Sequence, residues 1–158
     1  MTNASRAGFV ILCVSCAAPK PVQRNLLVHI NGGPTMFADA PKGTDIPVDT
    51  AKFNLEAGSI ELISPRAGGI TYRIHLPTPN PGTSYEFGNG SVGGECESMG
   101  KSAPLSGAVR LDEWTPGDGV VELAIDAWCT PEGFETAQRI RVTVTQGRAG
   151  NISDEMAP

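Results

Sequence analysis

Apolar and polar side chains alternate one by one along most of the chain after residue 25, which is the pattern of half-buried β-strands. The alternation covers residues 26–30, 52–56, 59–63, 70–76, 107–114, 120–129 and 139–145. The longest unbroken alternation runs from Val121 to Cys129, which predicts a central strand over 120–129 with Leu123 and Ile125 pointing into the core. Because consecutive strands usually pair, its expected neighbours are 107–114 and 139–145.

Residues 77–107 interrupt this pattern. Pro77, Pro79 and Pro81 precede a polar stretch rich in glycine, so we expect a long Gly/Pro-rich loop with a short strand near Tyr85–Phe87. No segment has a helical period long enough to predict a helix. The predicted fold is therefore all-β: a single antiparallel β-sandwich or small barrel.

Composition narrows the functional class. The chain has 158 residues, 40% hydrophobic and 18% charged, with 19 Gly and 13 Pro, which suits one domain with many turns. Its net charge of −5 argues against nucleic-acid binding, because that function needs a basic surface. The chain also contains no apolar run of about 20 residues that could form a membrane-spanning helix.

The N-terminus has the organisation of an export signal. Arg6 precedes an apolar run from Ala7 to Val14, which is too short to span a bilayer as a helix. The run ends in Val14-Ser15-Cys16. This segment resembles the signal peptide of bacterial lipoproteins, whose lipobox ends in the cysteine that receives the lipid. The resemblance covers residues 1–21 and implies acylation of Cys16 and attachment to membrane lipid.

The expected organisation follows from that resemblance: signal peptide 1–15, lipidated tether 16–25, β domain 26–146 and flexible tail 147–158. Ala17 stands where, in the Gram-negative lipoproteins that the segment resembles, Asp retains the protein at the inner membrane; the resemblance thus implies an outer-membrane location. Two alternatives stay open. The signal is cut after Ala17 or Ala18 to release a soluble periplasmic or secreted protein, or the segment is an uncleaved first strand.

The remaining cysteines, Cys96 and Cys129, are expected to form one disulfide in an exported protein. Two free thiols are the alternative. Cys13-Val-Ser-Cys16 has the C-x-x-C spacing of redox and zinc motifs. A zinc site would need a second cysteine pair and a redox motif would need a strand-to-helix context, and the sequence shows neither.

None of the candidate catalytic or cofactor-binding motifs in the sequence has the residue spacing or the structural context that its chemistry requires. Residues 94–102 resemble a phosphate loop, but five residues separate the glycines where four are needed, and no helix follows. His29 and His75 are expected on solvent-facing sides of their strands, with no third ligand for a metal. The acidic side chains between Asp112 and Asp126 are expected to form a solvated face. We therefore predict no catalytic residues, no metal and no cofactor.

Four aromatic residues, Tyr85, Phe87, Trp114 and Trp128, are a candidate binding surface, with both tryptophans expected on the polar face of the 107–129 hairpin. The alternative for these residues is burial in a two-sheet core or under a loop. The favoured function is a lipid-anchored envelope β-domain with a binding or structural role and an unidentified protein partner. The alternative is an exported enzyme or small-ligand-binding protein in which the 77–107 loop acts as a lid.

Overall fold

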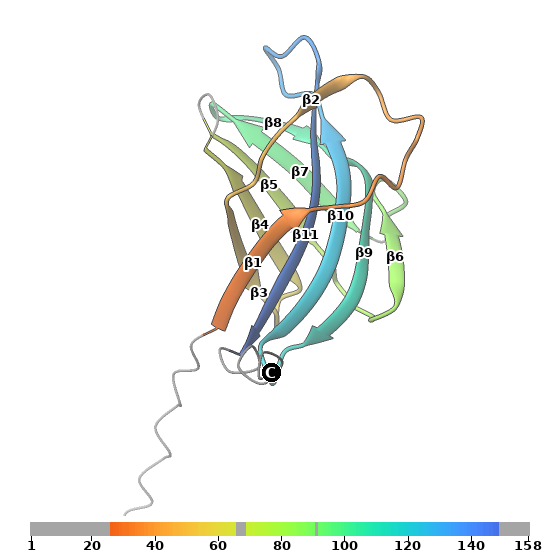
Figure 1. Cartoon of the computed structure of the whole chain (residues 1–158). Helices are drawn as coiled ribbons and strands as arrows, with labels where there is room; N and C mark the ends of the chain where they lie inside the picture. The colour runs from red at the N-terminus through yellow and green to blue at the C-terminus, as the bar shows by residue number, and fades with distance from the viewer. Residues whose placement is uncertain (1–25, 66–68, 91, 149–158) are drawn as a thin grey trace, which may run out of the picture.

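The protein is a β-sandwich of two sheets (Figure 1). The structure is a computed structural model that describes residues 26–65, 69–90 and 92–148. The first sheet, sheet A, has the order β1-β11-β10-β9-β6, and β2 pairs with β11 beside β1. Its strands are β1 (Leu26–Gly32), β2 (Gly43–Asp45), β6 (Thr83–Glu86), β9 (Ser106–Thr115), β10 (Val120–Cys129) and β11 (Ala137–Arg148). All its pairings are antiparallel except the short parallel contact of β2 with β11.

Sheet B packs behind sheet A and has the order β3-β4-β5-β7-β8, with antiparallel pairing throughout. Its strands are β3 (Thr50–Asn54), β4 (Ser59–Ser64), β5 (Ile70–His75), β7 (Gly93–Ser98) and β8 (Lys101–Pro104). The predicted all-β class is confirmed, and of the two predicted architectures the sandwich is the one observed. The described residues contain no helix that is long and apolar enough to cross a membrane.

The core lies between the sheets because each strand turns its apolar positions inward. In sheet A, β10 contributes Leu123 and Ile125, which are both fully buried. In sheet B, the inner face is supplied mainly by Leu62, Tyr72 and Ile74. As predicted, β10 has β9 and β11 as its neighbours.

Residues 77–107 depart from the prediction. The segment contributes the expected short strand β6, but it also supplies β7 and β8, which extend sheet B beyond β5. Among the described residues of this segment, the irregular stretches are the connections before, between and after these strands. The segment is therefore built into both sheets, and a lid role for all of 77–107 does not fit this arrangement.

A β-bulge changes the orientation of Trp114. Glu122 pairs with Glu113 while Leu123 pairs with Leu111, so Asp112 is an extra residue in β9. Beyond the bulge the alternation is shifted by one residue, and Trp114 points into the core with 7% of its surface exposed. Its ring N–H donates a hydrogen bond to the Leu55 carbonyl oxygen at 3.3 Å. The prediction that Trp114 lies on the polar face is wrong for this reason.

Candidate functional site

The outer face of sheet A is partly covered by its own chain. Residues 33–42, here called the strap, leave β1 and cross over β11 and β10 before the chain reaches β2 (Figure 1). Phe37 packs against Trp128 with ring centroids 5.4 Å apart and planes at 77°. The guanidinium carbon of Arg139 lies 5.9 Å from the centre of the same Trp128 ring. The strap therefore rests on an aromatic and cationic support from β10 and β11.

Asp126 fixes the strap to the sheet. Its carboxylate accepts two hydrogen bonds from the Arg139 side chain, from Nε and Nη2, both at 2.7 Å. It also accepts the backbone N–H groups of Met36 at 2.7 Å and Phe37 at 3.1 Å. Arg139 donates in addition to the Phe37 carbonyl at 3.2 Å. The fully buried carboxylate is thus satisfied by one guanidinium and two amides, which is what a buried charge requires.

The protonation of Asp126 reflects these contacts. Burial disfavours the charged form, but the hydrogen bonds from Arg139, Met36 and Phe37 together with the Arg139 charge outweigh it and hold the pKa of Asp126 below its ordinary value. The expectation that Asp126 belongs to a solvated acidic face is therefore wrong. The strap excludes water from this part of β10.

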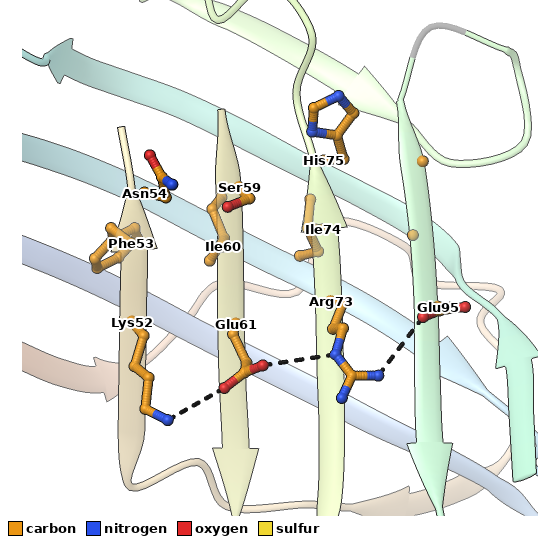
Figure 2. Close-up of a pocket in the computed structure, with 12 residues that line it drawn as sticks. Lys52, Phe53, Asn54, Ser59, Ile60, Glu61, Arg73, Ile74, His75 and Glu95 are labelled. Atoms are coloured by element: carbon orange, nitrogen blue, oxygen red, sulfur yellow. Dashed lines mark hydrogen bonds and ion pairs between the residues drawn. The ribbon is translucent and has the colours of Figure 1, made fainter. Parts of the chain in front are cut away.

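The outer face of sheet B, by contrast, carries a row of exposed charges. The strand registers place Lys52, Glu61, Arg73 and Glu95 next to one another on β3, β4, β5 and β7. We call these four residues the charge row; Figure 2 shows that its charges alternate in sign across the sheet. Such directly opposite pairs are the favourable arrangement for charged side chains on neighbouring strands.

Ion pairs connect the charge row from end to end. Lys52 Nζ lies 3.3 Å from Glu61 Oε1, Arg73 Nε lies 3.5 Å from Glu61 Oε2, and Arg73 Nη1 lies 3.6 Å from Glu95 Oε1. Arg73 also donates to Glu97, two residues further along β7. That hydrogen bond raises the pKa of Arg73; desolvation opposes it, and the charges of Glu97, Glu61 and Glu95 add to the increase. The row is mutually neutralised and held in place on four strands.

A second row on the same face is polar and contains no Lys, Arg, Asp or Glu. Asn54, Ser59, His75 and Gly93 are cross-strand neighbours in β3, β4, β5 and β7, and we call them the polar row. Neither the Ser59 hydroxyl nor the His75 imidazole makes a side-chain hydrogen bond within the described residues. Both groups therefore remain available to a ligand.

The charge row and the polar row line an open hollow of about 550 Å³ on the surface of sheet B (Figure 2). Its floor is the backbone of the strand residues between the two rows, whose side chains point to the core. Gly94 is required in this floor, because a Cβ atom there would lie 2.7 Å from the Phe87 ring beneath it. Gly93 is different: a Cβ there would meet only the Cβ of His75, at 3.9 Å, so glycine leaves space at that end of the hollow.

The four aromatic residues of the predicted binding surface do not form one surface. Trp114 and Phe87 are buried in the core, and Tyr85 is half-buried with its hydroxyl donating to Thr78 and accepting the Asn80 N–H. Trp128 alone lies on the outer face of sheet A, under Phe37. Trp128 and Phe87 do line a common hollow of about 440 Å³ beside the strap, together with Phe37 and Glu86.

The structure shows where the cysteine and histidine residues singled out in the sequence lie. Cys96 and Cys129 form a disulfide with their Cα atoms 6.4 Å apart, which joins β7 of sheet B to β10 of sheet A. His29 and His75 are both exposed, on different sheets. Cys16, the predicted acylation site, lies outside the described residues. No group of three or more His, Cys, Asp or Glu side chains within the described ranges could hold a metal ion.

Sequence reasoning missed the charge row and the polar row as sites. Each strand shows only polar residues on its outward positions, and nothing in any one strand indicates which residues of the other strands lie beside them. The strap was missed as well, although the Met36-Phe37 pair in a connection otherwise made of small residues, prolines and a few polar residues is a weak sign of a segment that packs against the fold. Comparison of the chain with protein-family models, with curated proteins and with solved structures finds no match.

Proposed function

We propose that the protein is an exported, lipid-anchored envelope domain that binds a neutral, hydrogen-bonding partner in the hollow on sheet B. The observation that carries the binding role is the difference between the two outer faces. One is partly covered by the strap, while the other presents a hollow between the ion-paired charge row and a polar row in which Ser59 and His75 make no side-chain hydrogen bond within the described residues. A preformed site with ordered side chains binds at lower entropic cost than a flexible one.

Export is supported by two separate features. The first 21 residues resemble a lipoprotein signal that places the acyl chain on Cys16. The disulfide between Cys96 and Cys129 is of the kind that persists in oxidising compartments. A tether from Cys16 to the first strand at Leu26 would reach at most about 33–36 Å when fully extended.

The hollow lies in the half of the sandwich where β1 begins. Leu26 pairs with Arg148 at the end of β11, and the adjacent β9–β10 turn comes so near that a Cβ on Gly119 would lie 2.9 Å from Leu26. Trp114, just before that turn, bonds to Leu55 in the β3–β4 turn, next to Asn54 of the polar row. An anchor on the preceding residues would thus hold the hollow close to the membrane surface.

The chemistry of the hollow favours a neutral ligand. The charged groups already satisfy one another, so an ionic ligand would have to break existing pairs. Ser59 and His75 instead offer a hydroxyl and an imidazole, which suit the hydroxyl or amide groups of a sugar chain. The aliphatic parts of the lining side chains give such a ligand an apolar contact.

The anchor is tested by labelling cells that express the full chain with a radioactive fatty acid. We expect incorporation into the wild-type protein and into Cys13→Ser, and loss of incorporation in Cys16→Ser. Labelling of Cys16→Ser at the wild-type level, or an intact Met1 in mass spectra of the cellular protein, would contradict acylation at Cys16.

The binding site is tested with Gly93→Leu, whose side chain would fill the hollow without backbone strain. The matched control is Gly117→Leu in the β9–β10 turn, where a Cβ meets nothing within 4 Å and the backbone is also free of the left-handed region. We expect the wild type and the control to co-sediment with insoluble cell-wall glycan, and Gly93→Leu to remain in the supernatant. Equal co-sedimentation of all three proteins would place binding elsewhere on the molecule.

A further inference from the structure

Within the described residues the two sheets have five outer strands, and β1 is the one without protection against pairing with another chain. The others are short: β2 has three residues and ends at Asp45, β3 has five and contains Lys52, β6 has four and ends at Glu86, and β8 has four that include Lys101 and Pro104. Charged side chains, proline and short length are the usual means of blocking an edge. β1 has seven residues, Leu-Leu-Val-His-Ile-Asn-Gly, with no proline and no Lys, Arg, Asp or Glu.

The hydrogen-bonding groups on the open side of β1 follow from its pairing with β11. The Gly33 N–H donates to the Arg141 carbonyl at 2.9 Å, which makes Gly33 and Arg141 a hydrogen-bonded pair in the β1–β11 register. In an antiparallel ladder these pairs alternate along the strand, so Leu27, His29 and Asn31 also bond to β11. The alternate residues direct their N–H and C=O groups away from β11; they are Leu26, Val28, Ile30 and Gly32.

The side chains on this edge are unusually apolar for their exposure. Leu26, Leu27 and Val28 are 37%, 44% and 39% exposed, and they are three of the four exposed large hydrophobic residues in the described part of the chain. The strap does not cover them, because after Gly33 it turns inward over β11 and β10 to reach Asp126. A free donor–acceptor edge and an exposed apolar patch therefore coincide on one strand.

We propose that β1 pairs antiparallel with β1 of a second copy of this chain, joining the two A sheets into one continuous sheet. The register is set by the outward groups. With His29 opposite His29 of the second copy, Val28 meets Ile30 and Leu26 meets Gly32, each pair twice by symmetry. This register is the one that uses all four outward residues of each β1 strand.

A second copy fits this edge because the arrangement is self-complementary and because β1 has no Lys, Arg, Asp or Glu that would repel the same residue of the second strand. A two-fold axis perpendicular to the sheet, passing between the two His29 residues, gives each β1 strand the same partners. The interface is confined to one strand and its flanks, so we expect a dissociating dimer rather than a permanent one. This inference rests on β1 alone and is independent of the proposed binding function.

Cysteine cross-linking tests the register. In the proposed dimer the two His29 residues form a non-hydrogen-bonded pair with Cα atoms about 4.5 Å apart, within the range that a disulfide spans. The two Asn31 residues would be displaced by about 13 Å along the strand, out of disulfide reach. The experiment uses the full chain with Cys13→Ser and Cys16→Ser, so that the Cys96–Cys129 disulfide holds the remaining native cysteines.

After mild oxidation, we expect His29→Cys to run as a covalent dimer on a non-reducing gel and Asn31→Cys to remain monomeric. Adding Val28→Pro to His29→Cys should abolish the cross-link, because it removes an outward N–H while leaving the β1–β11 bonds in place. Equal dimer yields from His29→Cys and Asn31→Cys would overturn the register. A purely monomeric His29→Cys, including the case in which residues 149–158 of the same chain cover the edge, would overturn the dimer.

Discussion

One carboxylate, that of Asp126, connects three parts of the molecule: β10, β11 through Arg139, and the strap through two backbone amides. Removing one partner of a buried ion pair is costly because the other charge is left uncompensated. We expect Asp126→Asn to lower the free energy of unfolding by about 3 kcal/mol, measured by chemical denaturation. If the free energy of unfolding changed by less than about 0.5 kcal/mol, the Asp126–Arg139 ion pair would contribute no more than a solvent-exposed ion pair does.

The same residue gives the stability a defined pH dependence. The folded-state pKa of Asp126 is lowered by Arg139 and the strap amides, whereas in the unfolded chain it returns to about 3.9. The stabilisation is therefore fully present above that value and is lost as the pH falls through the lower, folded-state pKa. The Asp126→Asn variant should lose less stability than the wild type does as the pH is lowered below about 4. Parallel stability profiles of the two proteins in that range would contradict this assignment.

Tyr72 presents the opposite situation, a buried polar group without a partner. Its hydroxyl makes no hydrogen bond within the described structure, and burial raises the pKa of the phenol. We expect Tyr72→Phe to raise the free energy of unfolding by about 1 kcal/mol, because it removes an unsatisfied group without leaving a cavity. A loss of stability in thermal or chemical unfolding would indicate that the hydroxyl has a partner such as a buried water molecule.

Asp126 and Tyr72 show how much of the environment of a single residue can be predicted from the sequence. The outward position of Asp126 on its strand is correctly predicted by the alternation, but its burial depends on the strap, which comes from residues 90 positions away. The inward position of Tyr72 is likewise predicted by the alternation in β5. Whether its hydroxyl finds a partner depends on side chains from other strands, which local periodicity does not describe.

At the scale of elements, β10 is the strand on which both faces can be compared. Ile125 is fully buried between the sheets, and we expect Ile125→Ala to lower the free energy of unfolding by about 2–5 kcal/mol through the cavity it leaves. Glu122 is exposed on the opposite face, so Glu122→Ala should change it by less than about 0.5 kcal/mol. The reverse ranking in denaturant unfolding would require a strand register shifted by one residue.

Two elements show where strand prediction from local pattern fails. β7 was missed because its inward positions carry Gly94, Cys96 and Ser98, so no large apolar residue marks the alternation. Trp114 was placed on the wrong face because the bulge at Asp112 shifts the period inside β9. By contrast β10 and β11, whose inward positions carry branched apolar side chains, lie where the sequence predicts them. The two rows of the sheet B hollow depend on the registers of four strands, one of them the missed β7.

For the whole molecule, the disulfide matters because it joins the two sheets. Cys96 lies on β7 of sheet B and Cys129 at the end of β10 of sheet A, 33 residues apart in the sequence. Closing a loop of this size restricts the unfolded chain and is expected to contribute about 3–4 kcal/mol.

The double variant Cys96→Ala/Cys129→Ala should therefore unfold at a clearly lower temperature than the wild type in a calorimetric scan. Adding a reducing agent should shift the wild type toward the variant and leave the variant itself unchanged. Identical melting temperatures for wild type and variant without reductant would contradict a formed bridge in the protein as isolated.

The antiparallel pairing of the first and last strands also determines where a reporter can be placed. Leu26 and Arg148 are partners, so the strand ends that continue toward both chain termini lie at the same end of the sandwich. The β7–β8 turn lies at the opposite end, where Met99 is 77% exposed. An antibody epitope inserted between Met99 and Gly100 would stand away from any surface that holds the termini. Accessibility of that epitope on intact cells would then reveal which side of the envelope the domain faces.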